Sequence, residues 1–191
     1  MEEIVRHNPD VIVIVDEAYI DFGGQSALKL LDRYENLLVV QTFSKARSMA
    51  GMRIGYAIGS PELIRVLHDV KYSYNSYTMN MPSLILGVEA VKDQAYFKET
   101  VEKIIRTREE AKERLGKLGF SFTDSQSNFL FVSHERIPAE ELFEALKKAQ
   151  IYVRYFKKPR LDNFLRITVG TDAEMEELYR FLEHYILQER R

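Results

Sequence analysis

Two short runs of apolar residues in the first part of the chain predict buried β-strands. Val11–Val15 is apolar at every position and stops at Asp16, and Leu37–Val40 repeats the pattern and leads into a polar stretch that ends at Lys45. A run without polar alternation is typical of a parallel strand that helices cover on both faces. Because the ligand crevice of an open α/β sheet lies at the carboxyl ends of its strands, we expect the polar residues after the two runs to meet there.

The segment that follows continues the pattern of strands and helices. Gly55–Gly59 predicts a third strand. Ser60 and Pro61 mark the start of a helix, because serine caps helices and proline is favoured at their first position. Residues 83–118 form one long helical pattern that is rich in Glu, Lys and Arg. We interpret this pattern as a single helix that carries the chain from one domain to another.

Beyond Gly119 the predicted elements become shorter. Short strands and two helices alternate, at 120–132, 138–149, 151–153, 164–169 and 172–188. Such alternation is typical of a small α+β domain. The sequence therefore predicts an α/β protein in three parts: residues 1–82 in a large domain with a parallel or mixed sheet, 83–118 as an interdomain helix, and 119–191 as a small α+β domain.

The amino-terminal end does not have the pattern of a complete domain. Residues 1–8 have the pattern of the tail of a helix, so the strand at Val11–Val15 is entered halfway through a βα unit. A parallel strand that is buried on both faces needs neighbours on both edges, and this chain offers few. We therefore expect that an N-terminal portion is missing from this chain.

Composition narrows the classes of function. The chain has 191 residues, 46% of them hydrophobic, which suffices for one sizeable core or for a core with a small satellite domain. Its 27 basic and 29 acidic residues leave a formal net charge of −2, which gives no electrostatic case for nucleic acid or an anionic membrane as a partner. There is no cysteine, and the four histidines are scattered, so we expect no disulfide and no metal site. No apolar signal core or run of about 20 apolar residues occurs, so a cytoplasmic protein is the expectation.

Asp16 and Lys45 are the first candidates for chemistry, because each follows a predicted strand. A carboxylate and an amine at the same sheet edge would converge in one crevice. On spacing alone, an ion pair at the sheet edge, or a capping aspartate and a solvated lysine, is the simpler explanation.

Three motifs around these residues change that interpretation. Asp-Glu-Ala-Tyr at 16–19, Thr-Phe-Ser-Lys at 42–45 and Gly-Met-Arg-Ile-Gly at 51–55 occur in this order at compact spacing. Together they resemble the fold-type-I aminotransferases that use pyridoxal 5′-phosphate, in which these motifs build the cofactor site. The resemblance covers essentially the whole chain.

The resemblance implies catalytic roles for Lys45, Asp16 and Tyr19. Lys45 would form the Schiff base with the cofactor aldehyde and later move a proton between the substrate Cα and the cofactor. Asp16 would pair with the pyridine nitrogen and keep it protonated, which maintains the ring as an electron sink. Tyr19 would donate to the phenolic oxygen of the ring.

The cofactor phosphate would be held by Thr42, Ser44 and Arg53, the arginine acting as a charged, planar fork of donors. We interpret the other two residues of the first motif, Glu17 and Ala18, as scaffold. No residue of the chain is expected to bind a metal.

The segment Lys71–Tyr77, with the sequence Lys-Tyr-Ser-Tyr-Asn-Ser-Tyr, narrows the family. It is similar to the corresponding segment of histidinol-phosphate aminotransferases. An aromatic-rich loop that packs between domains explains the same residues, and the two interpretations do not exclude each other.

The small domain also carries signatures of this group. They are Asn128 in a Ser-Asn-Phe motif, Arg154 after Ile-Tyr-Val, and Arg166 in Leu-Arg-Ile-Thr-Val-Gly. The resemblance implies that Arg166 meets the acidic group of the substrate and that Arg154 assists it. Since a guanidinium binds carboxylate and phosphate with the same planar geometry, one clamp would serve glutamate and a phosphate ester. Asn128 would be a structural amide or an amide near the substrate.

The family therefore implies amino transfer between histidinol phosphate and 2-oxoglutarate in histidine biosynthesis, by a homodimer with small-molecule substrates. Three alternatives remain: an aminotransferase for another substrate such as an aromatic amino acid, a related decarboxylase of a phosphorylated amino acid, and a chain without catalytic activity. The family also supplies, from its N-terminal half, a phosphate-binding loop, a stacking ring, an Asn and a Tyr from the partner subunit. None of these is found in this sequence.

Overall fold

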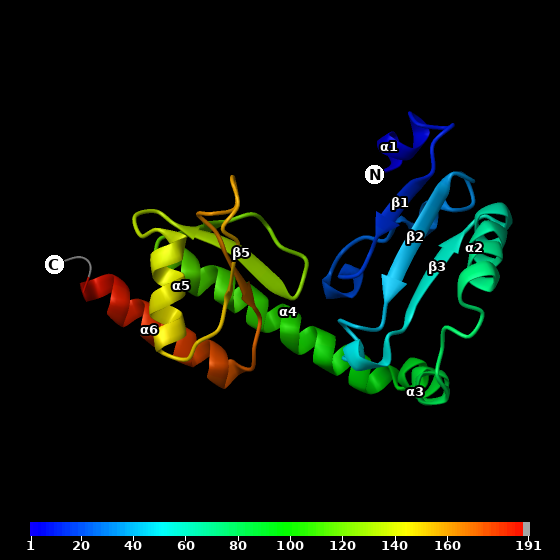
Figure 1. Ribbon diagram of the computed structural model, residues 1–191. Coiled ribbons are helices and arrows are strands. Elements are labelled where there is room, and N and C mark those ends of the chain that lie inside the picture. The colour runs from blue at the N-terminus through cyan, green and yellow to red at the C-terminus, as the bar shows by residue number, and fades with distance from the viewer. Residues whose placement is uncertain (189–191) are drawn as a thin grey trace. The chain divides into compact units, whose positions relative to one another are not determined.

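The computed structural model describes residues 1–188. The chain divides into two compact units, Met1–Thr100 and Val101–Arg191, and each is built on its own sheet (Figure 1). Two sheets with separate cores agree with the predicted α/β class.

The first unit contains a mixed sheet with the strand order β1-β2-β3. Its strands are β1 (Val13–Asp16), β2 (Leu37–Thr42) and β3 (Gly55–Gly59). β1 pairs with β2 in parallel, and β3 returns antiparallel to β2. The helices of the unit are α1 (Glu2–Arg6), the short 3₁₀ turns η1 (Ile20–Phe22), η2 (Ala27–Leu30) and η3 (Ala50–Met52), then α2 (Pro61–Tyr74), α3 (Met81–Lys92) and the start of α4 (Gln94–Lys117).

The predicted third strand and the helix after it are confirmed. β3 has the predicted bounds, and α2 begins at Pro61. The Ser60 hydroxyl accepts from the Leu63 N–H at 3.4 Å, as a capping serine does, and proline occupies the first turn.

One face of the first sheet is buried, whereas the other is covered at Leu38 of β2 and open along β1. Leu37 and Val39 are fully buried and pack in a cluster with Val5, Ala27 and Leu30. On β1 the burial alternates, and Ile14 is 63% exposed. The prediction that Val11–Val15 is covered on both faces is therefore wrong for this chain, because within residues 1–188 nothing buries the side chain of Ile14.

The single helix predicted over 83–118 is instead two helices, α3 and α4, separated at Asp93. Asp93 leaves the helical conformation, with φ −78° and ψ 71°, and its carboxylate accepts from the Tyr96 N–H at 3.1 Å. An aspartate that bonds to a backbone amide three residues ahead caps a new helix, which is why the pattern breaks there. The boundary between the compact units lies within α4, and the three-part division of the chain stays a proposal.

The second unit is a small α+β arrangement, as predicted. Its antiparallel sheet has the order β4-β5-β7-β6. The strands are β4 (Phe120–Phe122), β5 (Phe129–His134), β6 (Arg154–Tyr155) and β7 (Leu165–Thr168), and the helices after α4 are α5 (Ala139–Lys148) and α6 (Asp172–Gln188). Buried residues of the sheet and of all three helices form one continuous core, which includes Leu115, Leu130, Leu142 and Leu182.

The strand predicted at 151–153 lies later in the chain, at β6. Residues 151–153 are irregular, and in this segment pairing with β7 begins at Arg154 and includes Tyr155.

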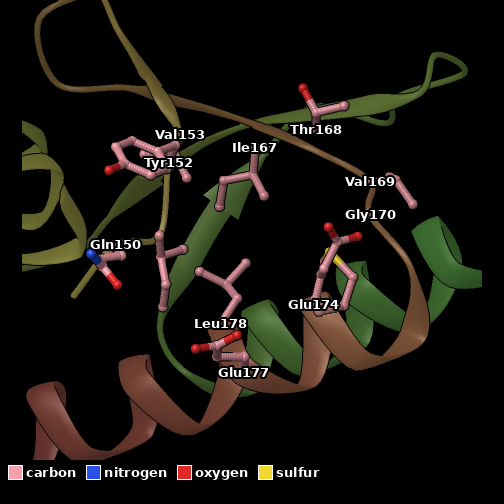
Figure 2. Close-up of a pocket in the computed structure, with 12 residues that line it drawn as sticks. Gln150, Tyr152, Val153, Ile167, Thr168, Val169, Gly170, Glu174, Glu177 and Leu178 are labelled. Carbon is pink, nitrogen blue, oxygen red and sulfur yellow. The ribbon is translucent and has the colours of Figure 1, made fainter.

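A cavity of about 440 Å³ lies between residues 150–153, the end of β7 and the start of α6 (Figure 2).

Residues 1–188 contain neither a membrane-spanning helix nor a metal-binding cluster of side chains. Among residues 1–188 no helix is both long and apolar enough to cross a bilayer. The same residues contain no cluster of histidine and carboxylate side chains that would hold a metal ion.

Replacing Leu37 with alanine should lower the free energy of unfolding by about 2–5 kcal/mol, because it leaves a cavity at a fully buried position. Ile14→Ala is the matched control on the neighbouring strand, and at an exposed site it should cost less than about 1 kcal/mol. Urea denaturation followed by circular dichroism measures both. An Ile14→Ala cost as large as that of Leu37→Ala would contradict the open face.

Candidate functional site

The three motifs of the first unit meet at one edge of its sheet. β1 ends at Asp16, which is the register partner of Val40 in the parallel strand β2. β2 ends at Thr42, whose partner across the antiparallel pair is Gly55. Arg53 precedes that glycine by two residues, so the ends of β1 and β2 and the start of β3 bring Asp16, Thr42 and Arg53 to the same edge.

Asp16 and Lys45 do not form the ion pair that their spacing alone suggested. The Asp16 carboxylate accepts from the Ala18 N–H at 3.0 Å, and the Lys45 ammonium lies 5.4 Å from the centre of the Tyr19 ring. Within residues 1–188 neither charged group has an ion-pair partner within 4.0 Å, and both side chains are exposed. Their charges therefore remain available to a ligand.

Thr42 and Ser44 form a small hydroxyl cluster at the end of β2. The Thr42 hydroxyl lies 2.9 Å from the Ser44 hydroxyl and 3.1 Å from the Ile54 carbonyl oxygen, and it accepts from the Ser44 N–H at 3.1 Å. The cluster ties the end of β2 to the residue that follows Arg53. The exposed Arg53 donates to the Ala50 carbonyl oxygen at 2.9 Å and has no carboxylate partner within the described chain.

The loop that carries Lys45 is closed by its own backbone bonds. The Ser48 N–H donates to the Lys45 carbonyl oxygen, and the Met49 N–H donates to the Phe43 carbonyl oxygen, both at 3.0 Å. Ser48 and Arg53 have φ values of 55° and 56°, which is left-handed backbone at non-glycine residues. Such conformations are unfavourable for residues with a Cβ and gather at binding sites, where the surrounding structure holds them.

The candidate substrate residues belong to the second unit and form a group of their own. Arg154 of β6 and Arg166 of β7 are direct register partners. The Arg166 guanidinium lies 5.3 Å from the Phe129 ring centre, and that of Arg154 lies 5.4 Å from the Phe156 ring centre. Neither arginine has a carboxylate within 4.0 Å in the described residues, and the buried Nε of Arg166 has no hydrogen-bond partner.

Two like charges that face each other across a strand pair repel, and a bound anion removes that cost. Asn128 lies beside this group, because its carbonyl oxygen accepts from the Val169 N–H at 2.9 Å, just beyond the end of β7. Arg154 and Arg166 thus face each other on neighbouring strands, and Asn128 immediately precedes β5, the strand on the other side of β7.

Two further residues organise the first unit near Lys45: Glu17, which sequence reasoning assigned to the scaffold, and Arg47, which it missed. Glu17, interpreted as scaffold, is buried, and its carboxylate accepts three hydrogen bonds. Arg47 donates to the Ala90 carbonyl oxygen at 2.6 Å, and its guanidinium lies 4.2 Å from the Phe97 ring centre. The position of Glu17 directly after a strand was the available signal, whereas the partners of Arg47 lie too far along the chain for any pattern to reveal.

The segment Lys71–Tyr77 covers the end of α2 and the residues after it. The side chains of Tyr74 and Tyr77 are 91% and 93% exposed. Both interpretations of this segment, a family signature and an aromatic packing loop, stay predictions.

Comparison with protein families finds one model, Aminotransferase class I and II, that matches residues 1–182. The chain is 54% identical over 187 residues to the histidinol-phosphate aminotransferase of Brachyspira hyodysenteriae, covering 97% of this chain and 53% of that relative. It is 51% identical over 186 residues to the enzyme of the same name from Lactococcus lactis subsp. lactis, covering 97% and 52%. The chain thus spans about half the length of these curated relatives.

Among solved structures, the fold is similar to the histidinol-phosphate aminotransferase of Sinorhizobium meliloti, which was determined in complex with pyridoxal 5′-phosphate. The TM-score is 0.83 at 26% identity, and the match covers 98% of this chain and 53% of that one. The geometry of the strand ends is thus set in a fold that is found in a cofactor-bound relative.

The facing arginines predict a stabilising effect of phosphate. At constant ionic strength, phosphate should raise the melting temperature of the chain, because it binds the folded pair and not the unfolded chain. Arg166→Met should reduce that rise and, without phosphate, stabilise the chain by up to about 1 kcal/mol by removing the repulsion. Differential scanning fluorimetry in phosphate and chloride buffers measures both effects.

Lys158→Met is the control, since it removes one positive charge from an exposed position of the same unit. It should retain the response to phosphate. A loss of the response in this variant as well would attribute the effect to net charge and contradict a local site.

Proposed function

Because this chain belongs to the class I and II aminotransferases, we propose that it binds pyridoxal 5′-phosphate and serves amino transfer between histidinol phosphate and 2-oxoglutarate. The observation that carries the proposal is the arrangement at the sheet edge, where Lys45 lies beside Tyr19, has no ion-pair partner within residues 1–188, and shares the edge with Asp16 and Arg53. The identity to histidinol-phosphate aminotransferases over 97% of the chain supports the choice of substrate.

The residues of the first unit fit this cofactor chemically. An amine, a carboxylate and a phenol are the groups needed to hold its aldehyde carbon, its ring nitrogen and its ring oxygen, and Lys45, Asp16 and Tyr19 supply them. When bound, the cofactor supplies an electron sink for bonds at the substrate Cα. Lys45, once free, would move the proton at that carbon. Asp16 has one hydrogen bond, to a backbone amide, so its carboxylate can accept another from a protonated ring nitrogen.

The phosphate group of the cofactor would be bound by Thr42, Ser44 and Arg53. Two hydroxyls and a guanidinium without a carboxylate partner are suitable donors for a dianion. The left-handed backbone at Arg53 would direct its side chain from a short turn between η3 and β3.

Substrate recognition would rest on Arg166 and Arg154, with Asn128 beside them. The planar fork of an arginine accepts a carboxylate or a phosphate ester equally well, which suits an enzyme whose two half-reactions bring different anions to one site. The unpartnered Nε of Arg166 supports this assignment.

Two other chemistries use the same cofactor groups and remain candidates. An aminotransferase for aromatic amino acids would need no phosphate recognition, and a decarboxylase of a phosphorylated amino acid would keep the arginine pair. Release of carbon dioxide would identify the decarboxylase, and formation of glutamate from 2-oxoglutarate would identify the transaminase. A chain without catalytic activity would give neither product.

The assay can be run on this chain alone and on the chain fused to the portion of the Brachyspira relative that it does not match. Glutamate formation with histidinol phosphate, and none with an aromatic amino acid, is the expected result. We propose that the active form is a homodimer in the cytoplasm, which light scattering and cell fractionation test.

Lys45 is predicted to be the lysine that binds the cofactor. After incubation with pyridoxal 5′-phosphate and reduction with borohydride, mass spectrometry should find the label on the peptide that contains Lys45. Lys45→Ala should lose this label and keep its fold, because the side chain is exposed. Preferential labelling of Lys29 or Lys71 would overturn the assignment.

Asp16→Asn is predicted to leave the cofactor bound and to slow turnover strongly, because the amide cannot keep the ring nitrogen protonated. Since an asparagine can preserve the bond from the Ala18 N–H, stability should change by less than about 0.5 kcal/mol. Steady-state kinetics of the active form measures the effect. Turnover within tenfold of the parent would contradict the role of Asp16.

A further inference from the structure

A chain of hydrogen-bonded side chains lies next to the candidate cofactor residues of the first unit. It begins at Glu17, which is only 5% exposed. The Glu17 carboxylate accepts from the Ser26 hydroxyl at 2.7 Å, from the Ala27 N–H at 2.6 Å and from the Gln41 amide at 2.8 Å. All three donors are neutral, and within residues 1–188 no cation lies within 4.0 Å of this carboxylate.

The chain continues through Gln41 to Tyr56. The Gln41 amide nitrogen donates to Glu17, so its oxygen is left to accept, and it accepts from the Tyr56 hydroxyl at 2.6 Å. Gln41 and Tyr56 are register partners in β2 and β3. The rings of Tyr56 and Phe43 pack edge to face, with the ring centres 5.8 Å apart. Burial raises the pKa of the Tyr56 hydroxyl, which keeps the donor protonated.

Two members of this hydrogen-bonded chain, Glu17 and Gln41, are covalent neighbours of residues proposed to hold the cofactor. Glu17 follows Asp16, and Gln41 precedes Thr42. Successive side chains of a strand point to opposite faces, so Gln41 and Thr42 lie on opposite sides of the sheet. The hydrogen-bonded chain therefore joins the strand ends from the face opposite the Thr42 hydroxyl.

We propose that the Glu17–Gln41–Tyr56 chain is a positioning device that holds the ends of β1, β2 and β3 in fixed register, and thereby sets the placement of Asp16 relative to the Lys45 loop. The assignment of a cofactor to these residues rests on the proposed function. The positioning itself is a property of the ligand-free polypeptide.

The direction of its hydrogen bonds makes the Glu17–Gln41–Tyr56 chain sensitive to the identity of each residue. Carboxylate, amide and phenol are arranged so that Tyr56 donates to the Gln41 oxygen and the Gln41 nitrogen donates to Glu17. Gln41→Leu keeps much of the side-chain volume but removes one donor from the buried Glu17 carboxylate and the acceptor of the Tyr56 hydroxyl. Removing a donor from the buried Glu17 carboxylate is more costly than the bond itself is favourable, so the strand ends should loosen locally.

Hydrogen exchange of the ligand-free chain provides the test. In Gln41→Leu, the Phe43, Ser48 and Met49 amides should exchange at least about tenfold faster, whereas the Ile64 amide at the start of α2 should keep its rate. Gln94→Leu is the control, since it makes the same chemical change at an exposed position of α4. It should leave the three loop amides unchanged.

A rescue separates positioning from a general loss of stability. The double variant Glu17→Gln/Gln41→Glu exchanges the amide and the carboxylate, so the new glutamine can donate to the new glutamate, which can still accept from Tyr56. It should restore slow exchange of the loop amides. Uniform acceleration at Ile64 and in the loop, or no rescue by the exchanged pair, would overturn the proposal in favour of a general contribution to stability.

Binding of pyridoxal 5′-phosphate, measured by its absorbance, then tests the consequence for the site. Gln41→Leu should weaken binding by at least about tenfold, and the exchanged pair should recover it. If the parent chain binds no cofactor, the proposed function of this chain fails while the exchange experiment still decides the positioning. If the parent binds and Gln41→Leu binds equally well despite faster loop exchange, the positioning proposal is wrong.

Discussion

The parallel pairing of β1 with β2 is the constraint on which the candidate site depends. It sets Asp16 opposite Val40, so that both strands deliver their polar residues to one edge. The antiparallel return of β3 adds Arg53 from the other direction, which a purely parallel sheet would have sent to the opposite edge. A slip of one residue in either pairing would turn every side chain of that strand to the other face, and the group of Asp16, Thr42 and Arg53 would no longer exist.

In the loop between Phe43 and Ile54, backbone and side-chain contacts together hold Lys45, the lysine proposed to bind the cofactor. The loop is closed by backbone bonds, and two non-glycine residues in it adopt left-handed conformations. Arg47, held against Phe97 and the Ala90 carbonyl oxygen, anchors the same loop to the helices that follow. The loop is therefore held in place by contacts that do not involve the side chain of Lys45.

Much of this arrangement could be predicted from the sequence, and what could not be predicted has a physical cause. The ends of the apolar runs located Asp16 and Lys45, because a strand that stops at polar residues marks an edge. The burial of Val11–Val15 could not be predicted, since an apolar run shows that a strand can be buried but does not show which elements lie around it. The break between α3 and α4 at Asp93 depends on a hydrogen bond from the Tyr96 N–H to the Asp93 carboxylate, which forms only in the folded chain. The opposition of Arg154 and Arg166 depends on strand register, and the three donors to Glu17 meet only in the folded chain.

The open edge of β1 has a consequence for handling the chain in solution. Its unpaired backbone amides and carbonyls, next to the exposed Ile12 and Ile14, form a template on which another extended chain can add. Natural edge strands oppose this with lysines, prolines or bulges, and the single charge within Val13–Asp16 stands at its last position. Self-association through this edge would grow with protein concentration and compete with folding, so dilute refolding and a lysine in place of Ile14 are the means of suppressing it.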